Sequence, residues 1–255
     1  MPTPTPTQAR RIDPTRRAPR PTPPERVRRS WWLLEFYRSA LGKKYAMAVS
    51  GVFIMAWLVA HLVGNLKMYL SADAFNFYSD WLREGLGYPV LPHTWLLWLL
   101  RLLLIGSFVV HIHAAYALTV MNHRARSAGY RSRDYVAANF AARTMRWSGI
   151  IVGLFVIYHL LDLSWGPANP RFVRGDAYGN TLASLQRWPV ALFYVLANVA
   201  LGYHLYHGGW SLFQSLGLNT PRFNAWRRWF AIGFAVVVAG GFISFPLAVV
   251  SGVVS

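Results

Sequence analysis

Five apolar stretches of the chain are long enough to cross a bilayer as helices. A helix that rises about 1.5 Å per residue needs roughly 20 residues to cross the hydrocarbon core of a membrane. Shorter segments with charges, prolines and glycines separate these stretches. The pattern predicts an all-α integral membrane protein whose helices lie near residues 45–67, 94–122, 147–165, 188–216 and 229–252.

The chain before the first span has a different pattern. Residues 1–30 combine Pro, Thr and Arg with almost nothing to bury, which predicts a disordered basic arm in the cytoplasm. This arm lacks the apolar stretch of a secretory signal, and its prolines oppose the amphipathic helix of a transit peptide. Residues 31–44 mix aromatic and charged side chains and predict an interfacial helix that leads into a transmembrane domain over residues 45–252.

Composition supports this class. The chain of 255 residues is 55% hydrophobic and 14% charged, and it holds 12 Trp, so its apolar content exceeds that of an ordinary soluble domain. The net charge of +17 does not indicate nucleic-acid binding, because the basic residues sit between long apolar runs. With no cysteine, disulfides, thiolate-held iron–sulfur clusters and thioether-attached haem are excluded, and nitrogen or oxygen must hold any metal.

Basic loops predict the orientation. The segment between the second and third spans contains a single acid, Asp134, against six arginines: Arg124, Arg126, Arg131, Arg133, Arg143 and Arg146. Three more arginines, Arg222, Arg227 and Arg228, lie between the last two spans. Because positive loops stay in the cytoplasm, we expect the N-terminus inside and the C-terminus outside, with the acidic loop that holds Asp73, Asp80 and Glu84 on the outer side.

Each of the first four spans contains a histidine that a membrane segment does not tolerate without a partner: His61, His111, His159 and His204. At about 1.5 Å per residue, His61 and His159 lie ~9 Å from the outer ends of their helices, whereas His111 and His204 lie ~27 and ~25 Å from theirs. Two matched pairs about 16 Å apart are what two stacked b-type haems in a four-helix bundle require, each with two neutral imidazole ligands.

Helix faces and a repeat support these pairs. His61 and His159 share their faces with small and polar residues, as bundle-facing positions do: Ser50, Gly64 and Asn65, and Ser148 and Asp162. His111 and His113 point to nearly opposite sides, and we choose His111, which lies with Ser107 and Asn122, as the ligand. Residues 47–62 and 145–160 share the pattern M-x-x-S-G-x9-H-L without a gap, which favours two hairpins related by a pseudo-twofold axis.

Other polar residues are candidates for haem contacts. Ser50, Ser148, Trp147 and Gln214 lie near the cytoplasmic end, where they are able to bond inner-haem propionates, although packing serines and an interfacial tryptophan are equal alternatives. Arg101 either neutralises an outer-haem propionate or extends to the outer surface. His207 shares the face of His204 but lies ~4.5 Å further along the axis, so we expect it to bond a propionate or a ligand.

Four segments together carry a family resemblance: "HLVGNLKMY", "HIHAAYALTVMNHRAR", "RTMRWSGIIVGLFVIYHLL" and "HLYHGGWSLFQSLGLN". Over residues 40–252 the chain resembles the single-chain, five-helix, di-haem cytochrome b anchors of succinate dehydrogenases and fumarate reductases. The resemblance implies a bacterial cytoplasmic membrane, and partner flavoprotein and iron–sulfur subunits that carry out the succinate chemistry of the tricarboxylic acid cycle. Electrons then pass between the iron–sulfur subunit and membrane quinone of the respiratory chain through two haems, with menaquinone the commoner quinone.

The resemblance also assigns residues. It implies that His111 and His204 bind the inner haem and that His61 and His159 bind the outer one. Family members with a transmembrane proton route carry a glutamate where this chain has Gly202.

Three alternatives stay open. A di-haem cytochrome b of a hydrogenase or formate dehydrogenase has a similar topology. The "HLYHGG" and "HIH" segments also resemble histidine boxes of membrane di-iron desaturases, but His61 and His159 are isolated at the opposite depth. A scaffold without redox chemistry is the third.

Overall fold

The computed structural model describes residues 31–125, 137–218 and 220–255. Within these ranges every regular element is helical, and five helices are long and apolar enough to span a membrane, which confirms that prediction. The expected arm, residues 1–30, lies outside the described residues. So do four residues of the expected cytoplasmic loop, Arg126, Arg131, Arg133 and Asp134.

The five long helices keep close to the predicted ranges. They are α2 (Ala40–Asn65, continued by the 3-10 turn η1, Leu66–Tyr69), α4 (Trp95–Arg124), α5 (Ala137–His159, continued by the π turn η3, Leu160–Ser164), α7 (Trp188–Ser215) and α8 (Pro221–Val250). The largest difference is at α5, which begins ten residues before the predicted 147, and α8 begins eight residues before the predicted 229. Pro221 occupies the first turn of this helix, where its missing N–H costs nothing.

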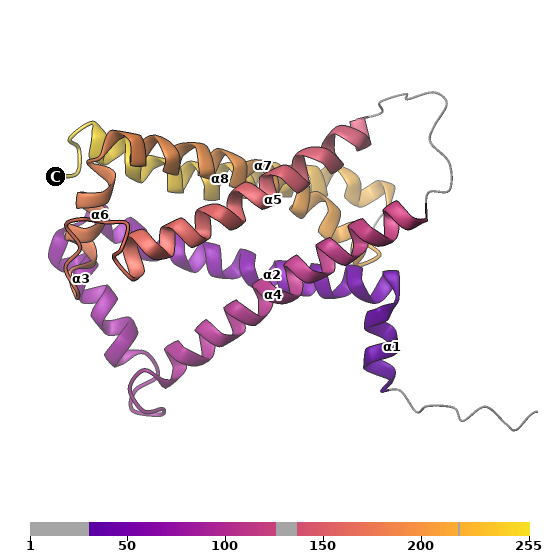
Figure 1. Ribbon diagram of the computed structural model, residues 1–255, viewed down its shortest axis with the longest axis horizontal. Coiled ribbons are helices and arrows are strands. Elements are labelled where there is room, and N and C mark those ends of the chain that lie inside the picture. The colour runs from indigo at the N-terminus through magenta and orange to yellow at the C-terminus, as the bar shows by residue number, and fades with distance from the viewer. Residues whose placement is uncertain (1–30, 126–136, 219) are drawn as a thin grey trace, which may run out of the picture.

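The predicted interfacial helix is shorter than expected. It is α1 (Trp32–Arg38), which lies across the end of α2 (Figure 1) and has no buried residue. Ser39 separates the two helices, and its hydroxyl accepts the backbone N–H of Gly42 at 2.9 Å. The ammonium of Lys43 donates to the carbonyls of Tyr37 and Arg38, at 3.0 and 2.7 Å. Because a serine cap starts a helix, residues 40–44 belong to the first span.

The long helices form two hairpins and one added helix. Helix α2 packs along α4, and α5 packs along α7, while the two hairpins meet mainly through α2 against α7. Helix α8 runs along the length of α7 and also reaches α2 (Figure 1). This arrangement leaves α2, α4, α5 and α7 around a common interior, with α8 outside it.

The outward faces suit a lipid environment. Large apolar side chains in the middle of the spans are more than half exposed, among them Val109, Leu154 and Val236. Exposed tryptophans lie at both ends of the bundle, as in the aromatic belts of membrane proteins: Trp31, Trp32, Trp147, Trp226 and Trp229 at one end, and Trp81, Trp95, Trp98, Trp165 and Trp188 at the other.

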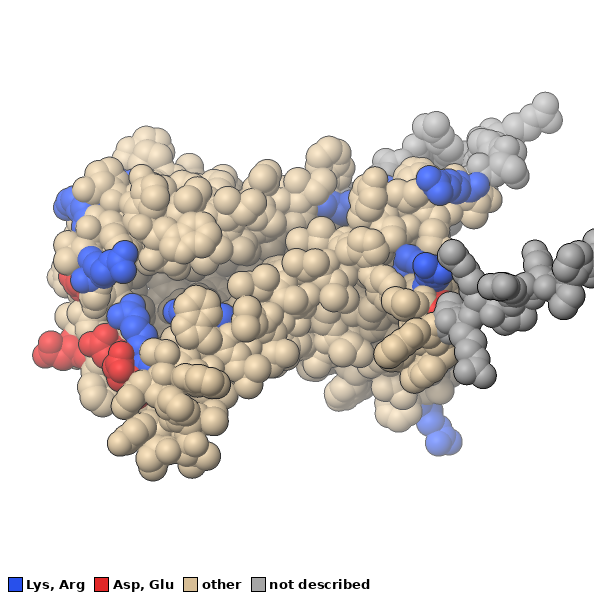
Figure 2. Space-filling model, turned by 60° about the horizontal axis from the view of Figure 1, so that its bottom comes forward, with Lys and Arg blue, Asp and Glu red and all other residues tan. Residues whose placement is uncertain are grey.

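Short helices close the end that carries the acidic residues. The segment expected as a loop contains α3 (Ala72–Asp80) and the π turn η2 (Trp81–Gly85), and α6 (Ala177–Leu185) packs against α3. Asn76 joins them, because its amide donates to Asp176 at 3.0 Å and accepts the N–H of Tyr178 at 2.9 Å. Most visible Asp and Glu side chains gather at this end (Figure 2).

Candidate metal centres

The four span histidines form two pairs inside the bundle. The ring centres of His61 on α2 and His159 on α5 lie 5.9 Å apart. Those of His111 on α4 and His204 on α7 lie 6.3 Å apart. The depth count predicts the same two pairs, and each pair takes one histidine from each hairpin.

Two glycines locate the pairs along the bundle axis. A Cβ atom at Gly51 of α2 would lie 3.4 Å from Cε1 of His111, and one at Gly149 of α5 would lie 3.2 Å from Cε1 of His204. Each glycine stands ten residues before the histidine of the other pair, His61 or His159. At 1.5 Å per residue the pairs are therefore about 15 Å apart, close to the spacing expected from the sequence.

The ring spacing fits a metal ion held on two sides. Two metal–imidazole bonds of about 2 Å, with each ring centre about 1.2 Å behind its nitrogen, place the ring centres roughly 6.3 Å apart. The observed spacing of the inner pair, 6.3 Å, equals this value, and that of the outer pair, 5.9 Å, lies 0.4 Å below it. Two nitrogens do not complete a metal site alone, but two imidazoles would suffice to hold a haem, whose porphyrin would supply the remaining ligands.

The M-x-x-S-G repeat surrounds the inner pair. Nδ1 of His111 donates to the carbonyl of Met47 at 3.2 Å, and the Ser50 hydroxyl lies 3.4 Å from the same nitrogen. A carbonyl oxygen only accepts, so Nδ1 carries the proton and Nε2 keeps its lone pair. In the second copy the Ser148 hydroxyl donates to the carbonyl of Met145 at 3.1 Å, so its oxygen is free to accept Nδ1–H of His204 at 3.4 Å. Both copies therefore leave Nε2 free to bind a metal.

A cavity between the hairpins contains the inner pair. Its volume is about 150 Å³, and residues of α2, α4, α5 and α7 line it, including His111 and His204. Glycines at 51, 208 and 209 keep its walls open. Ser211 and Ser215 also line it, whereas the predicted contact Gln214 is exposed. Residues seven and eleven positions after His204 share its helix face, so the spacing contained a signal for both serines.

Nδ1 of His159, in the outer pair, lies 3.4 Å from the hydroxyl of Tyr194. That hydroxyl donates to Asp162 at 2.8 Å, so its oxygen is free to accept the N–H of His159. Asp162 is fully buried and forms an ion pair of 2.7 Å with Arg187. From the sequence alone, Asp162 is only a polar residue on the helix face of His159. The signal for its role is that it is a lone acid one helical turn after that histidine.

The remaining sequence candidates lie elsewhere. His113 is exposed, and its Nδ1 lies 2.5 Å from the hydroxyl of Tyr37 on α1, so it faces away from the bundle interior. His207 bonds Thr144 at 3.1 Å through Nε2. Trp147 is 68% exposed. The guanidinium of Arg101 lies 5.1 Å from the ring centre of Trp98 on the exposed side of α4.

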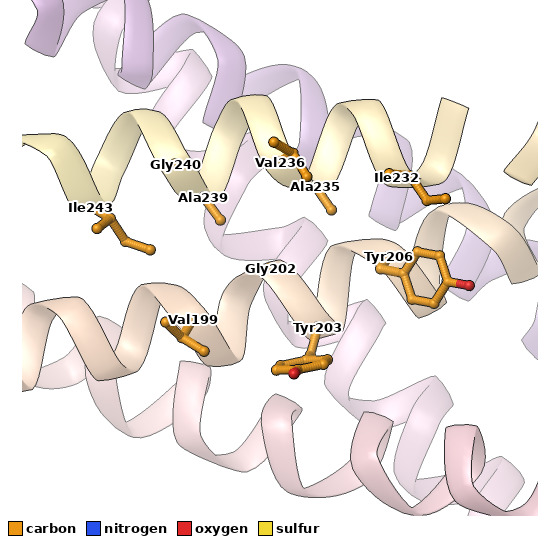
Figure 3. Close-up of a pocket in the computed structure, with 10 residues that line it drawn as sticks. All are labelled: Val199, Gly202, Tyr203, Tyr206, Ile232, Ala235, Val236, Ala239, Gly240 and Ile243. Atoms are coloured by element: carbon orange, nitrogen blue, oxygen red, sulfur yellow. The ribbon is translucent and has the colours of Figure 1, made fainter. Parts of the chain in front are cut away.

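A second hollow lies between α7 and α8 on the outside of the bundle (Figure 3). The hollow stays open because small residues line it: Gly202, Ala235, Ala239 and Gly240. Tyr203 and Tyr206 contribute the hydroxyl groups of its lining. No histidine lines it among the described residues.

Comparison of the chain with known protein families, characterised proteins and solved structures finds no match. Among the residues that the structure describes, no group of three or more His, Cys, Asp and Glu side chains gathers as a metal site. The two histidine pairs are the candidate metal-binding arrangement in the described part of the chain.

Proposed function

We propose that this chain is the membrane-anchor cytochrome b subunit of a succinate:quinone oxidoreductase. In this proposal His61 and His159 hold one b-type haem and His111 and His204 hold a second. The observation that carries it is the geometry of the pairs: four histidines from four membrane helices face one another two by two, at ring spacings of 5.9 and 6.3 Å.

The residues around the pairs fit such a group. The Met47 carbonyl accepts Nδ1–H of His111, and hydroxyl oxygens of Ser148 and Tyr194 lie beside Nδ1 of His204 and His159. Three rings therefore present Nε2 toward a ligand. The inner cavity is lined mostly by apolar side chains, which excludes water and suits a porphyrin face. Haem bound between two imidazoles supplies a one-electron iron couple within the membrane.

The charge distribution supports a cytoplasmic partner at one end. Lys43, Lys44 and Arg146 lie at the end of the bundle where α8 starts with its own arginines, and Asp73 and Asp80 lie at the opposite end. We infer that the basic end faces the cytoplasm and receives the iron–sulfur and flavoprotein subunits. The chain's part in the reaction is to hold both electron carriers between that end and membrane quinone.

Haem content tests the first part of the proposal. The full chain, purified from native membranes with its bound subunits, should give two haem b per chain in a pyridine haemochrome assay. A preparation free of porphyrin would overturn the proposal and favour a scaffold.

The identity of the reductant tests the second part. Succinate should reduce the haems of the purified complex, and a flavoprotein and an iron–sulfur subunit should accompany the chain. Reduction by hydrogen or formate without reduction by succinate would instead assign the chain to a hydrogenase or formate dehydrogenase. A di-iron desaturase is less well supported, because the described histidines form two separate pairs rather than one cluster.

A further inference from the structure

A fully buried carboxylate lies beside the outer histidine pair. Asp162 accepts hydrogen bonds from Arg187 at 2.7 Å, from Tyr194 at 2.8 Å and from Ser184. A buried carboxylate is costly unless charged and polar partners surround it. These three partners let Asp162 stay ionised inside the protein.

Tyr194 connects this carboxylate to the outer pair. Its single hydroxyl proton points to Asp162, so the hydroxyl oxygen is the acceptor for Nδ1–H of His159 at 3.4 Å. The result is a chain of hydrogen bonds from Asp162 through Tyr194 to His159. It holds His159 in the tautomer whose Nε2 is available to a metal.

The two charges of the ion pair lie at different distances from the site. Asp162 follows His159 by one turn, within the π turn η3. Arg187 precedes α7, is 29% exposed, and also donates to the carbonyl of Ala168 at 2.9 Å. The negative charge is therefore on the histidine side of the pair, and the positive charge is on the solvent side.

We propose that Asp162, acting through Tyr194, is a positioning residue that lowers the midpoint potential of the outer haem; this rests on the proposed function. A hydrogen bond accepted from an axial imidazole makes it a stronger electron donor, and a nearby negative charge stabilises the oxidised iron. The inner pair has neutral carbonyl and serine neighbours instead. The structure thus assigns different electrostatic settings to two otherwise similar sites.

Redox titration of the purified complex tests this with Asp162→Asn and Tyr194→Phe. Each should raise the potential of the outer haem, by a shift on the order of tenfold in its oxidised-to-reduced ratio, or ~59 mV for one electron. The inner haem should stay unchanged. Tyr158→Phe is the matched control, because the ring centre of Tyr158 lies 6.3 Å from that of Tyr194 in the same cluster. The haem missing from a His159→Ala variant identifies the outer one.

The outcomes separate the two proposals. If both haems bind and neither variant moves the outer potential, or if both haems shift equally, this inference is wrong and the proposed function stands. If the unaltered complex contains no haem, both fall. Should Asp162→Asn fail to accumulate, Tyr194→Phe decides alone, because it keeps the ion pair and removes only the connection.

Discussion

The two hairpins share a repeat but differ around their outer histidines. In the second hairpin, the position three residues after His159 is Asp162, which is fully buried. In the first, the equivalent position after His61 is Gly64, and a Cβ atom there would lie 2.6 Å from the ring of Tyr78. The place of a carboxylate in one half is thus occupied by an aromatic ring of α3 in the other.

The second helices differ in the same way. Tyr194, ten residues before His204, bonds Asp162. Arg101, at the equivalent position before His111, is exposed and lies over the ring of Trp98. The M-x-x-S-G segments, in contrast, make matching contacts in both halves. The repeat therefore preserves the surroundings of the inner pair, and the two halves diverge at the outer pair.

The largest effect is expected from a substitution that removes one ring of a histidine pair. His204→Ala should abolish the inner haem, because an apolar helix offers no replacement for an axial nitrogen. Haem per chain should fall from two to one or the complex should fail to assemble, as measured by pyridine haemochrome and by subunit content. His113→Ala is the control, since His113 contacts Tyr37 outside the interior. A His204→Ala protein with a complete two-haem spectrum would contradict the assignment.

The next effect concerns the buried ion pair of the second hairpin. Arg187→Gln leaves the Asp162 carboxylate without its charged partner. The free energy of unfolding should fall by about 3 kcal/mol. This value is at the low end of the range for buried ion pairs because Arg187 is partly exposed. Thermal unfolding in detergent, followed by near-UV circular dichroism, measures it. Arg171→Gln is the control, because the exposed Arg171 bonds the neutral Gln186 and the Ala183 carbonyl. Equal loss in both variants would show that the ion pair adds nothing.

A smaller effect compares two glycines on one helix. A methyl group at Gly149 would contact His204 at 3.2 Å, whereas one at Gly153 would meet nothing within 4 Å. Gly149→Ala should therefore tilt the ring and change the absorption and electron paramagnetic resonance spectra of one haem. Gly153→Ala should leave both spectra intact and stabilise α5 by up to about 1 kcal/mol. Identical spectra for the two variants would contradict the close approach of His204 to α5.

The smallest effect belongs to the serines of the repeat. Ser50→Ala and Ser148→Ala each remove a hydroxyl 3.4 Å from Nδ1 of an inner ring, and His111 keeps its bond to the Met47 carbonyl. We expect a modest shift in the inner midpoint potential, of similar size for both variants, in a redox titration. An unchanged titration would leave these serines as packing residues, and unequal shifts would show that the halves differ at the inner pair as well.

Much of this arrangement follows from residue spacing. The five spans and the two-by-two placement of His61, His111, His159 and His204 were predictable, because rise per residue and helix periodicity act along each helix separately. The ligation of iron by these rings stays a prediction. Helix faces also separate His111 from His113, which differ by two positions and therefore point apart.

Other features depend on contacts between distant segments. Asp162 meets Tyr194 and Arg187 only through the packing of α5 beside α7, so no local pattern predicts the cluster. The short helices α3 and α6 were not predicted, although their capping residues Ser71 and Asp176 are signals present in the sequence. Gln214 is exposed, whereas Ser215, one position further on, lines the inner cavity. A contact between Gln214 and a haem propionate stays a prediction.

The division of each histidine pair between the hairpins has a consequence for assembly. Neither α2 with α4 nor α5 with α7 contains both rings of any pair, so a half-molecule has only isolated imidazoles to offer. A group bound by both rings at either level fastens one half to the other, in a region where the protein's own contacts run mainly through α2 and α7. Binding of such a group would therefore also join the two hairpins. In a chain that lacks the group, the two hairpins should separate from each other.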